Sequence, residues 1–319
     1  MTPSEVVVAS ALRTPTIQDI LYKYENRLRV TKWVSCRFSP VESGAAMNTS
    51  EIDAPDLIPD PPAPEVLVEL CVGGVTDVEV AEAFRLQRIE LNSALPLGGL
   101  TPAAGLVKSA RQIFQGEIIA MVRPREGGFC YSESEFRVMV DDASALIDMG
   151  ADGIAVGFLL PSGELDEAQC DRFRNAVPRT ALVLHRAFDV VRDQREAVRK
   201  MIELGWDRIL TSGGARTAVE GAGRIRELAE LAGEQIEILP GSGIRSGNVG
   251  DLLTRTGLRQ VHASCGTIQS DRSMQANPLL NFSTPGSLDG GAYTTASNHE
   301  LSALMLAIDT WLKNREIAG

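Results

Sequence analysis

The chain has 319 residues, a formal net charge of -11 and a pI of about 4.9, with 44% hydrophobic and 23% charged residues. This balance is typical of a globular protein with a sizeable core, and the negative charge argues against nucleic acid or an anionic membrane as the main partner. No apolar run approaches the roughly 18 residues of a membrane span, and five cysteines without a CxxC pair favour a reducing compartment, so we expect a cytoplasmic protein.

Residues 1–64 differ in composition from the rest and are predicted to form a partly disordered N-terminal extension. Thr16–Val30 is compatible with a short amphipathic helix, whereas Pro55–Pro64 is rich in proline and predicts an extended linker. A targeting segment, or a start codon placed too far upstream, is the alternative interpretation. The folded domain is expected to begin near Glu65.

From Glu65 onward, short β-type runs alternate with helical stretches. The runs start roughly 22 to 36 residues apart, which is the span of a strand–helix unit rather than of a hairpin. The eight expected strands are Val66–Cys71, Arg88–Leu91, Glu117–Val122, Gly153–Val156, Ala181–His185, Asp207–Leu210, Gln235–Leu239 and Arg259–His262. Eight short units predict an α/β fold, a (β/α)8 TIM barrel over 65–266; the alternative is an open doubly wound parallel sheet.

Start signals support helices between these strands. Ser132, three residues before a glutamate, shows a capping-box pattern, and Thr76 shows the same pattern. Thr101, followed by proline, is typical of an N-cap with proline at the first helical position. The C-terminal segment 267–319 is expected to be a loop followed by a helix over Asn298–Arg315 that packs on the outside of the barrel.

Period-two alternation assigns one face of each strand to the barrel interior. Because apolar helices cover the outer face, the polar side chains should point inward. This inner set comprises Glu69, Cys71, Glu90, Asn92, Met121, Arg123, His185, Ser212 and His262. Buried charges are costly when unpaired, so Glu69 or Glu90 should pair with Arg123, or these residues should bind a ligand. We favour a ligand site at the strand C-termini, where the chemistry of barrels gathers.

Three glycine-rich turns follow the last three strands, at Thr211–Gly214, Pro240–Gly243 and Ser264–Gly266. Barrels often hold a phosphate near the loops after strands seven and eight, where backbone N–H groups converge. The alternative is that these are simply tight turns. The ligand-binding residues predicted on this basis are Arg125, Ser212, Gly213, Gly214, Gly241, Gly243, His262 and Ser264.

Seven segments in this order resemble the CutC copper-homeostasis family. They are Glu69–Val72, Arg88–Leu91, Gly98–Pro102, Val122–Arg125, Gly128–Tyr131, His185–Asp189 and Arg208–Gly214. The series covers about 200 residues, from Glu65 to Cys265. The resemblance implies a (β/α)8 barrel, a cytoplasmic protein, a homo-oligomer as one assembly state, and a role in handling Cu(I).

The resemblance also implies copper ligands at the ends of the first two strands, where the family has cysteines. The first position matches Cys71, whereas the second holds Asn92. Soft Cu(I) prefers thiolate and thioether ligands, so an amide is a poor replacement. Met121 and Cys130 are candidates for the missing donor. The alternative for Cys71 is that of a small buried hydrophobic residue.

Three functions are compatible with these residues. The first is copper binding or handling through the first-strand cysteine. The second is an enzyme for a small anionic substrate, a phosphate or carboxylate, in which Arg123 and the glycine-rich turns hold the anion while His185 with Glu69 or Glu90 transfers protons. Asp189 would then orient the imidazole, unless it caps the next helix. The third is an interaction scaffold that uses the outside of the barrel.

Overall fold

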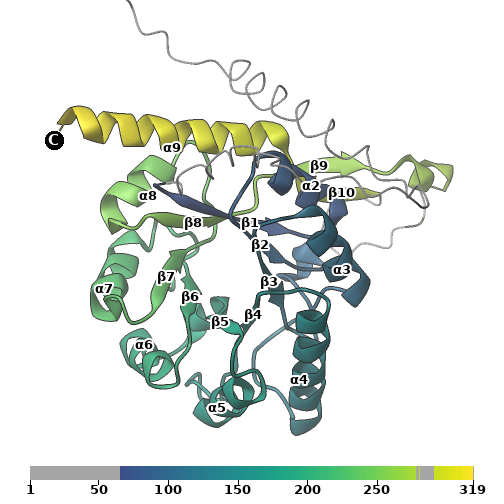
Figure 1. Ribbon diagram of the computed structural model, residues 1–319, viewed down its shortest axis with the longest axis vertical. Helices are drawn as coiled ribbons and strands as arrows, with labels where there is room; N and C mark the ends of the chain where they lie inside the picture. Colours follow the sequence, from purple (N-terminus) through teal and green to yellow (C-terminus); the bar gives the residue numbers. More distant parts are fainter. Residues whose placement is uncertain (1–64, 278–279, 281–290, 319) are drawn as a thin grey trace, which may run out of the picture. The chain divides into compact units, whose positions relative to one another are not determined.

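Eight parallel strands form a nearly closed barrel (Figure 1). This computed structural model describes residues 65–277, 280 and 291–318, so the predicted extension over 1–64 lies outside the described residues. The strands are β1 Leu67–Val72, β2 Arg88–Leu91, β3 Glu117–Met121, β4 Gly153–Val156, β5 Ala181–Leu184, β6 Arg208–Thr211, β7 Glu237–Pro240 and β8 Gln260–Ala263. Their spatial order, β7-β6-β5-β4-β3-β2-β1-β8, follows the sequence around the ring. This confirms the (β/α)8 TIM barrel and excludes the doubly wound alternative.

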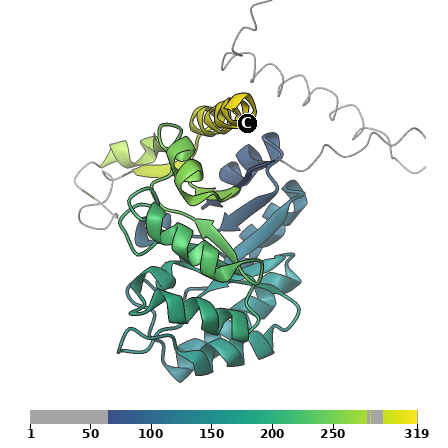
Figure 2. The ribbon, with the colours of Figure 1, turned by 90° about the vertical axis from the view of Figure 1, so that its left-hand side faces the viewer.

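Helices surround the strands (Figures 1 and 2). They are α2 Val75–Ala83, α3 Ala104–Ile113, α4 Glu133–Asp148, α5 Glu167–Ala176, α6 Gln194–Glu203, α7 Ala222–Ala232 and α8 Val249–Thr256. The capping box predicted for α4 is confirmed, because Ser132 and Glu135 each accept a hydrogen bond from the backbone N–H of the other. The buried face of α4 consists of Phe136, Met139, Ala143 and Leu146.

Two predicted helix starts are wrong. α2 begins at Val75, so Thr76 lies inside its first turn. α3 begins at Ala104, and the hydroxyl of Thr101 instead accepts a 3.0 Å hydrogen bond from the backbone N–H of Arg123. This hydrogen bond therefore joins the loop after β2 to the segment that follows β3, which contains Arg123.

The barrel closes between β7 and β8. An isolated parallel bridge joins Gly241 to His262, and Gln260 Nε2 donates a 3.2 Å hydrogen bond to the carbonyl of Ile238. Within the described part of the chain these two strands form no ladder like those of the other neighbouring pairs. His262 thus lies at the seam that completes the ring.

The interior of the barrel has an apolar side and a polar side. Strands β3 to β7 contribute a buried apolar cluster, which consists of Ile119, Met121, Ala155, Val183, Leu210 and Leu239. Strands β1, β2 and β8 contribute polar side chains that contact one another, namely Glu69, Arg88, Glu90, Asn92 and His262. One group of interacting polar side chains is therefore concentrated beside β1.

The segment after β8 is more ordered than the predicted loop. β9, Gly266–Ser270, pairs antiparallel with β10, Ala292–Ala296, in a separate two-stranded sheet. Asp77 of α2 is buried and accepts hydrogen bonds from the Thr295 hydroxyl at 2.6 Å and the backbone N–H of Ala296 at 2.7 Å. This carboxylate holds β10 against α2.

The last helix, α9 (Asn298–Ala318), lies beside α8 (Figures 1 and 2). It buries Leu301, Leu304 and Ile308, and Trp311 Nε1 donates a 2.8 Å hydrogen bond to the Thr254 hydroxyl. Among the helices that the structure describes, α9 included, none combines the length and the apolar character of a membrane span.

Candidate functional site

Strand register brings four predicted site residues together inside the barrel. Glu69 and Cys71 share a face of β1, because side chains alternate along a strand. Glu69 is the register partner of His262 on β8, and Cys71 is the partner of Glu90 on β2. Side chains from three strands therefore meet in one cluster.

Glu69 is a buried member of this cluster that accepts two hydrogen bonds. Its carboxylate accepts hydrogen bonds from Arg88 Nε and, at 2.7 Å, from His262 Nδ1, and both Glu69 and Arg88 are 2% exposed. Burial alone would raise the pKa of Glu69, but the hydrogen bond and charge of His262 and the charge of Arg88 hold this pKa at about 2. Glu69 is thus an ionised carboxylate that fixes the orientation of the His262 ring.

Cys71, Glu90 and His262 place three potential metal-ligand atoms within 4.8 Å of one another. Glu90 Oε2 lies 3.7 Å from Cys71 Sγ and 3.8 Å from His262 Nε2. Asn92 Nδ2 donates a 2.9 Å hydrogen bond to the same oxygen and lies 3.6 Å from Cys71 Sγ. The other oxygen, Glu90 Oε1, is buried and has no hydrogen-bond partner among the described residues.

The charges of the cluster depend on one another. Burial raises the pKa of the Cys71 thiol and the pKa of Glu90. Burial would lower the pKa of His262, but the charge of Glu90 and hydrogen bonds with Cys71 and Glu69 raise it well above its usual value. The surroundings of His262 therefore stabilise a positive charge on or beside its ring. Either a proton or a metal cation can supply this charge.

The donor types suit a metal ion. In many metal sites a carboxylate accepts one imidazole N–H so that the other ring nitrogen faces the metal, and Glu69 stands in this relation to His262. Thiolate and imidazole are ligands for copper and zinc, whereas carboxylate suits harder ions better. Of the other predicted donors, Met121 belongs to the apolar cluster and Cys130 is exposed, and their role as copper ligands stays a prediction.

Arg123 belongs to a second polar group, at the end of β3. Instead of pairing with either buried glutamate, its guanidinium donates hydrogen bonds to the carbonyls of Leu97 and Gly99 at 3.0 Å and Gly127 at 2.8 Å. Arg123 is 6% exposed, and its Nε has no partner among the described residues.

His185, at the end of β5, is buried near Arg123. Its Nδ1 accepts a 3.1 Å hydrogen bond from the backbone N–H of Ala187. Burial, and secondarily the charge of Arg123, lowers the pKa of His185 to about 3. The imidazole is therefore neutral at physiological pH and is a hydrogen-bond donor at Nε2, a state that does not favour the proton-transfer role predicted for it.

Asp189 organises the turn after β6 instead of orienting His185 or capping a helix. Its carboxylate accepts hydrogen bonds of 2.6–3.1 Å from the backbone N–H groups of Ser212 and Gly214 and the hydroxyls of Thr211 and Ser212. The N–H of Gly213 bonds to the Thr211 hydroxyl at 2.8 Å. The protein's own carboxylate thus takes the position that an anion was predicted to occupy at this turn.

The other predicted ligand-binding residues lie in turns or are already bonded. Gly241 carries the bridge to β8, Gly243 has a positive φ of 69°, and Ser264 is exposed. Arg125 forms an ion pair with Glu135 at 2.5 Å. An anion site at the turns after β7 and β8 stays a prediction.

Sequence reasoning missed Arg88, the buried partner of Glu69. The available signal was its position two residues before Glu90, which places it on the same inner face of β2. A second missed pair is formed by Arg208 and Glu237, 2.6 Å apart at the starts of β6 and β7.

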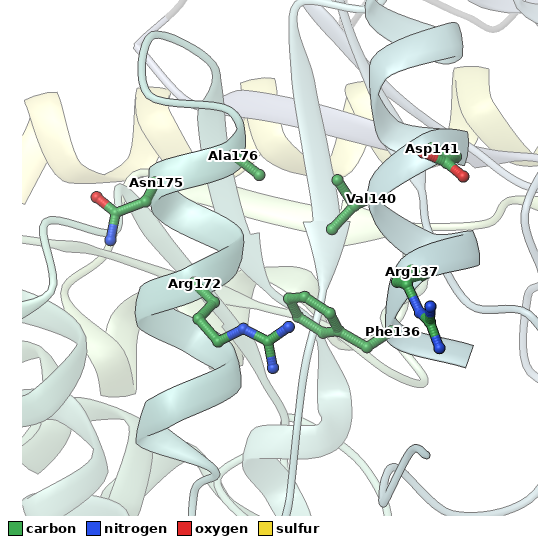
Figure 3. A pocket seen from close by; sticks show the side chains of 7 residues that line it. All are labelled: Phe136, Arg137, Val140, Asp141, Arg172, Asn175 and Ala176. Atoms are coloured by element: carbon green, nitrogen blue, oxygen red, sulfur yellow. The ribbon is translucent and has the colours of Figure 1, made fainter. Parts of the chain in front are cut away.

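A surface pocket lies between α4 and α5 on the outside of the barrel (Figure 3). Its lining includes Arg172, which lies over the Phe136 ring with 4.3 Å between the guanidinium carbon and the ring centroid. Arg172 also pairs with Glu133 at 2.8 Å. Because this cation is already satisfied, the pocket is a weaker candidate than the barrel interior.

Comparison with known proteins identifies the family. The family model described as CutC matches residues 66–267. The CutC family protein of Treponema denticola is 41% identical over 217 residues, which cover 68% of this chain and 88% of that protein. The corresponding protein of Caulobacter vibrioides is 41% identical over 204 residues, or 64% of this chain and 83% of the relative.

A solved structure gives the same result. It is the crystal structure of CutC of Streptococcus agalactiae, which is described with a proposed role in copper homeostasis. It matches with a TM-score of 0.60 at 30% identity, and the match covers 62% of this chain and 98% of that one. The chain therefore belongs to the CutC family, as its seven sequence segments predicted.

Proposed function

We propose that this protein handles copper by binding one Cu(I) ion between Cys71 and His262, with Glu90 beside them. The main support is the convergence of a thiol, an imidazole and a carboxylate within 4.8 Å. The family adds to this, because its Streptococcus agalactiae member is described with a proposed role in copper homeostasis. The expected reducing, cytoplasmic environment suits this ion, because reducing conditions maintain copper as Cu(I).

The chemistry of the donors favours Cys71 and His262 as the ligands. Cu(I) is soft and binds thiolate sulfur, and imidazole nitrogen is also a common copper ligand. Glu69 accepts the Nδ1–H of His262, which leaves Nε2 on the side of Cys71 and Glu90. Binding would release the protons of the thiol and of Nε2.

His262 would also replace the second donor. The CutC resemblance implies a cysteine at the end of the second strand, and this chain has Asn92 there. The amide of Asn92 donates to Glu90 and approaches the sulfur of Cys71, so Asn92 would hold these groups in place without ligating copper. The second ligand would thus come from β8 rather than from β2.

The test is anaerobic Cu(I) titration of the full-length, reduced protein against a colorimetric Cu(I) chelator. We expect one tightly bound Cu(I) per chain. Cys71→Ser and His262→Gln should each weaken binding by at least about tenfold, because each removes a ligand. Cys265→Ser is the matched control, since it removes a partly buried thiol outside the cluster and should bind as wild type.

Two outcomes would contradict the proposal. Equal Cu(I) binding by wild type and Cys71→Ser would remove the role of this thiol. Binding of Zn(II) without Cu(I), measured in a parallel titration, would retain a metal centre but reject copper as its ion.

A further inference from the structure

We propose that Arg123 and His185 form a second ligand subsite, which takes a small oxyanion such as a phosphate or a dicarboxylate. The subsite lies at the ends of β3 and β5 and shares no residue with the copper proposal, so either proposal can fail without the other. Both side chains are more than nine-tenths buried, and each has a nitrogen without a partner among the described residues, Arg123 Nε and His185 Nε2.

Phe129 links the two side chains. Its ring centroid lies 5.3 Å from the guanidinium carbon of Arg123 and 5.0 Å from the centroid of the His185 ring. The charge of Arg123 also contributes to the lowered pKa of His185. The two side chains therefore contact the same aromatic ring, which would form the apolar wall of the subsite.

Both nitrogens are donors and require an acceptor. His185 Nδ1 accepts the backbone N–H of Ala187, so the proton of the neutral ring is on Nε2. Arg123 Nε carries a hydrogen and has no acceptor capacity. A ligand that satisfies both must accept two hydrogen bonds, as the oxygens of a phosphate or a carboxylate can.

The charge of Arg123 indicates that this ligand is an anion. Three arginines are buried in the described part of the chain, and two of them have carboxylate partners, Arg88 with Glu69 and Arg208 with Glu237. Arg123 is the exception, because it forms no ion pair with a described carboxylate. Its bonds go to neutral carbonyl oxygens, and the neutral hydroxyl of Tyr131 lies close to it. A buried, uncompensated cation is costly, and a bound oxyanion would supply the missing charge.

Access to the subsite would depend on Phe129. The unpartnered nitrogens are shielded from solvent, and Phe129 is the half-buried residue that contacts both side chains. It follows two exposed glycines, Gly127 and Gly128. An entering anion would displace the Phe129 ring and then lie against it.

The experiment is a titration of full-length, ¹⁵N-histidine-labelled protein, followed through the imidazole resonances by NMR. The chain has three histidines, so His262 and His299 serve as internal references for His185. The probes are inorganic phosphate and malonate. We expect at least one probe to shift the His185 Nε2–H resonance in a saturable manner while the His299 resonance stays constant.

Arg123→Gln should weaken this response at least about tenfold, because it removes the charge that attracts the anion. Arg172→Gln is the matched control, since it removes an arginine stacked on an aromatic ring outside the barrel, and its response should equal that of wild type. If Arg123→Gln does not fold, Arg123→Lys replaces it, and weakened binding is again expected because the Nε–H is lost. Absence of a saturable His185 shift with both probes in wild type would overturn the proposal, as would an undiminished shift in the folded Arg123 variant.

Discussion

Replacing His185 with glutamine should make the protein less sensitive to mild acid. His185 is 3% exposed, and burial together with the charge of Arg123 lowers its pKa from 6.5 to about 3. Below pH 6.5 the histidine of the unfolded chain takes up a proton that the folded protein does not bind. Stability contributed through this residue is therefore lost as the pH falls from about 6.5 toward 3.

The size of the effect follows from the two pKa values. At pH 5 the unfolded histidine is almost fully protonated while the folded one is neutral, which costs about 2 kcal/mol relative to pH 7. His262 acts in the opposite direction, because its pKa is raised: its contribution is fully present below pH 6.5 and is lost as the pH rises through its folded pKa. This contribution remains in the variant and cancels in the comparison with wild type.

The assay is urea denaturation at pH 7 and pH 5, followed by tryptophan fluorescence and circular dichroism. The loss of unfolding free energy between the two pH values should be about 2 kcal/mol smaller in His185→Gln than in wild type. The control is His299→Gln, because the side chain of His299 is 69% exposed, and its loss should match that of wild type. If His185→Gln loses as much stability as wild type on acidification, the assignment of a buried neutral imidazole is refuted.

Three further changes test the packing of the barrel by urea denaturation at neutral pH. Arg88→Met should destabilise the protein by about 3–5 kcal/mol, because it removes one partner of the buried Glu69 carboxylate. A loss of less than about 1 kcal/mol would show that the ion pair with Arg88 is not needed for stability. Asp189→Ala should cost at least about 2 kcal/mol, since the turn after β6 loses the acceptor for its N–H and O–H groups; unchanged stability would argue against this role. Ser132→Ala should cost about 1 kcal/mol through loss of the α4 cap, and an unaltered urea midpoint would contradict the capping assignment.

The sequence predicts the barrel well because the signal is local and repeated. Each expected strand lies within two residues of an observed one, since β-type runs such as Gly153–Val156 alternate regularly with amphipathic helices. The pairing of β9 with β10 was missed. These strands are joined by a long segment rather than a tight turn, and β9 has mostly exposed or half-buried residues, so neither a hairpin signal nor a buried face marks them.

The inner polar residues could be predicted, but their pairing could not. Alternation places Glu69 and Arg123 on inner faces, and the same rule applies to the missed Arg88, but it does not give the height of these residues along the barrel axis. Strand register decides which side chains pair, because Glu69 is opposite Arg88, whereas Arg123 lies beyond the end of β3. The partners of Asp189 were equally hidden, since they come from the turn after a different strand.

The copper proposal rests on Cys71 and His262 acting as ligands of one metal ion, and X-ray absorption spectroscopy of Cu(I)-loaded, full-length protein tests this most directly. We expect the copper coordination shell to contain one sulfur together with imidazole nitrogen. The sulfur contribution should disappear in Cys71→Ser, and the imidazole contribution in His262→Gln. A coordination shell that retains its sulfur in Cys71→Ser and its imidazole in His262→Gln would contradict the proposed centre.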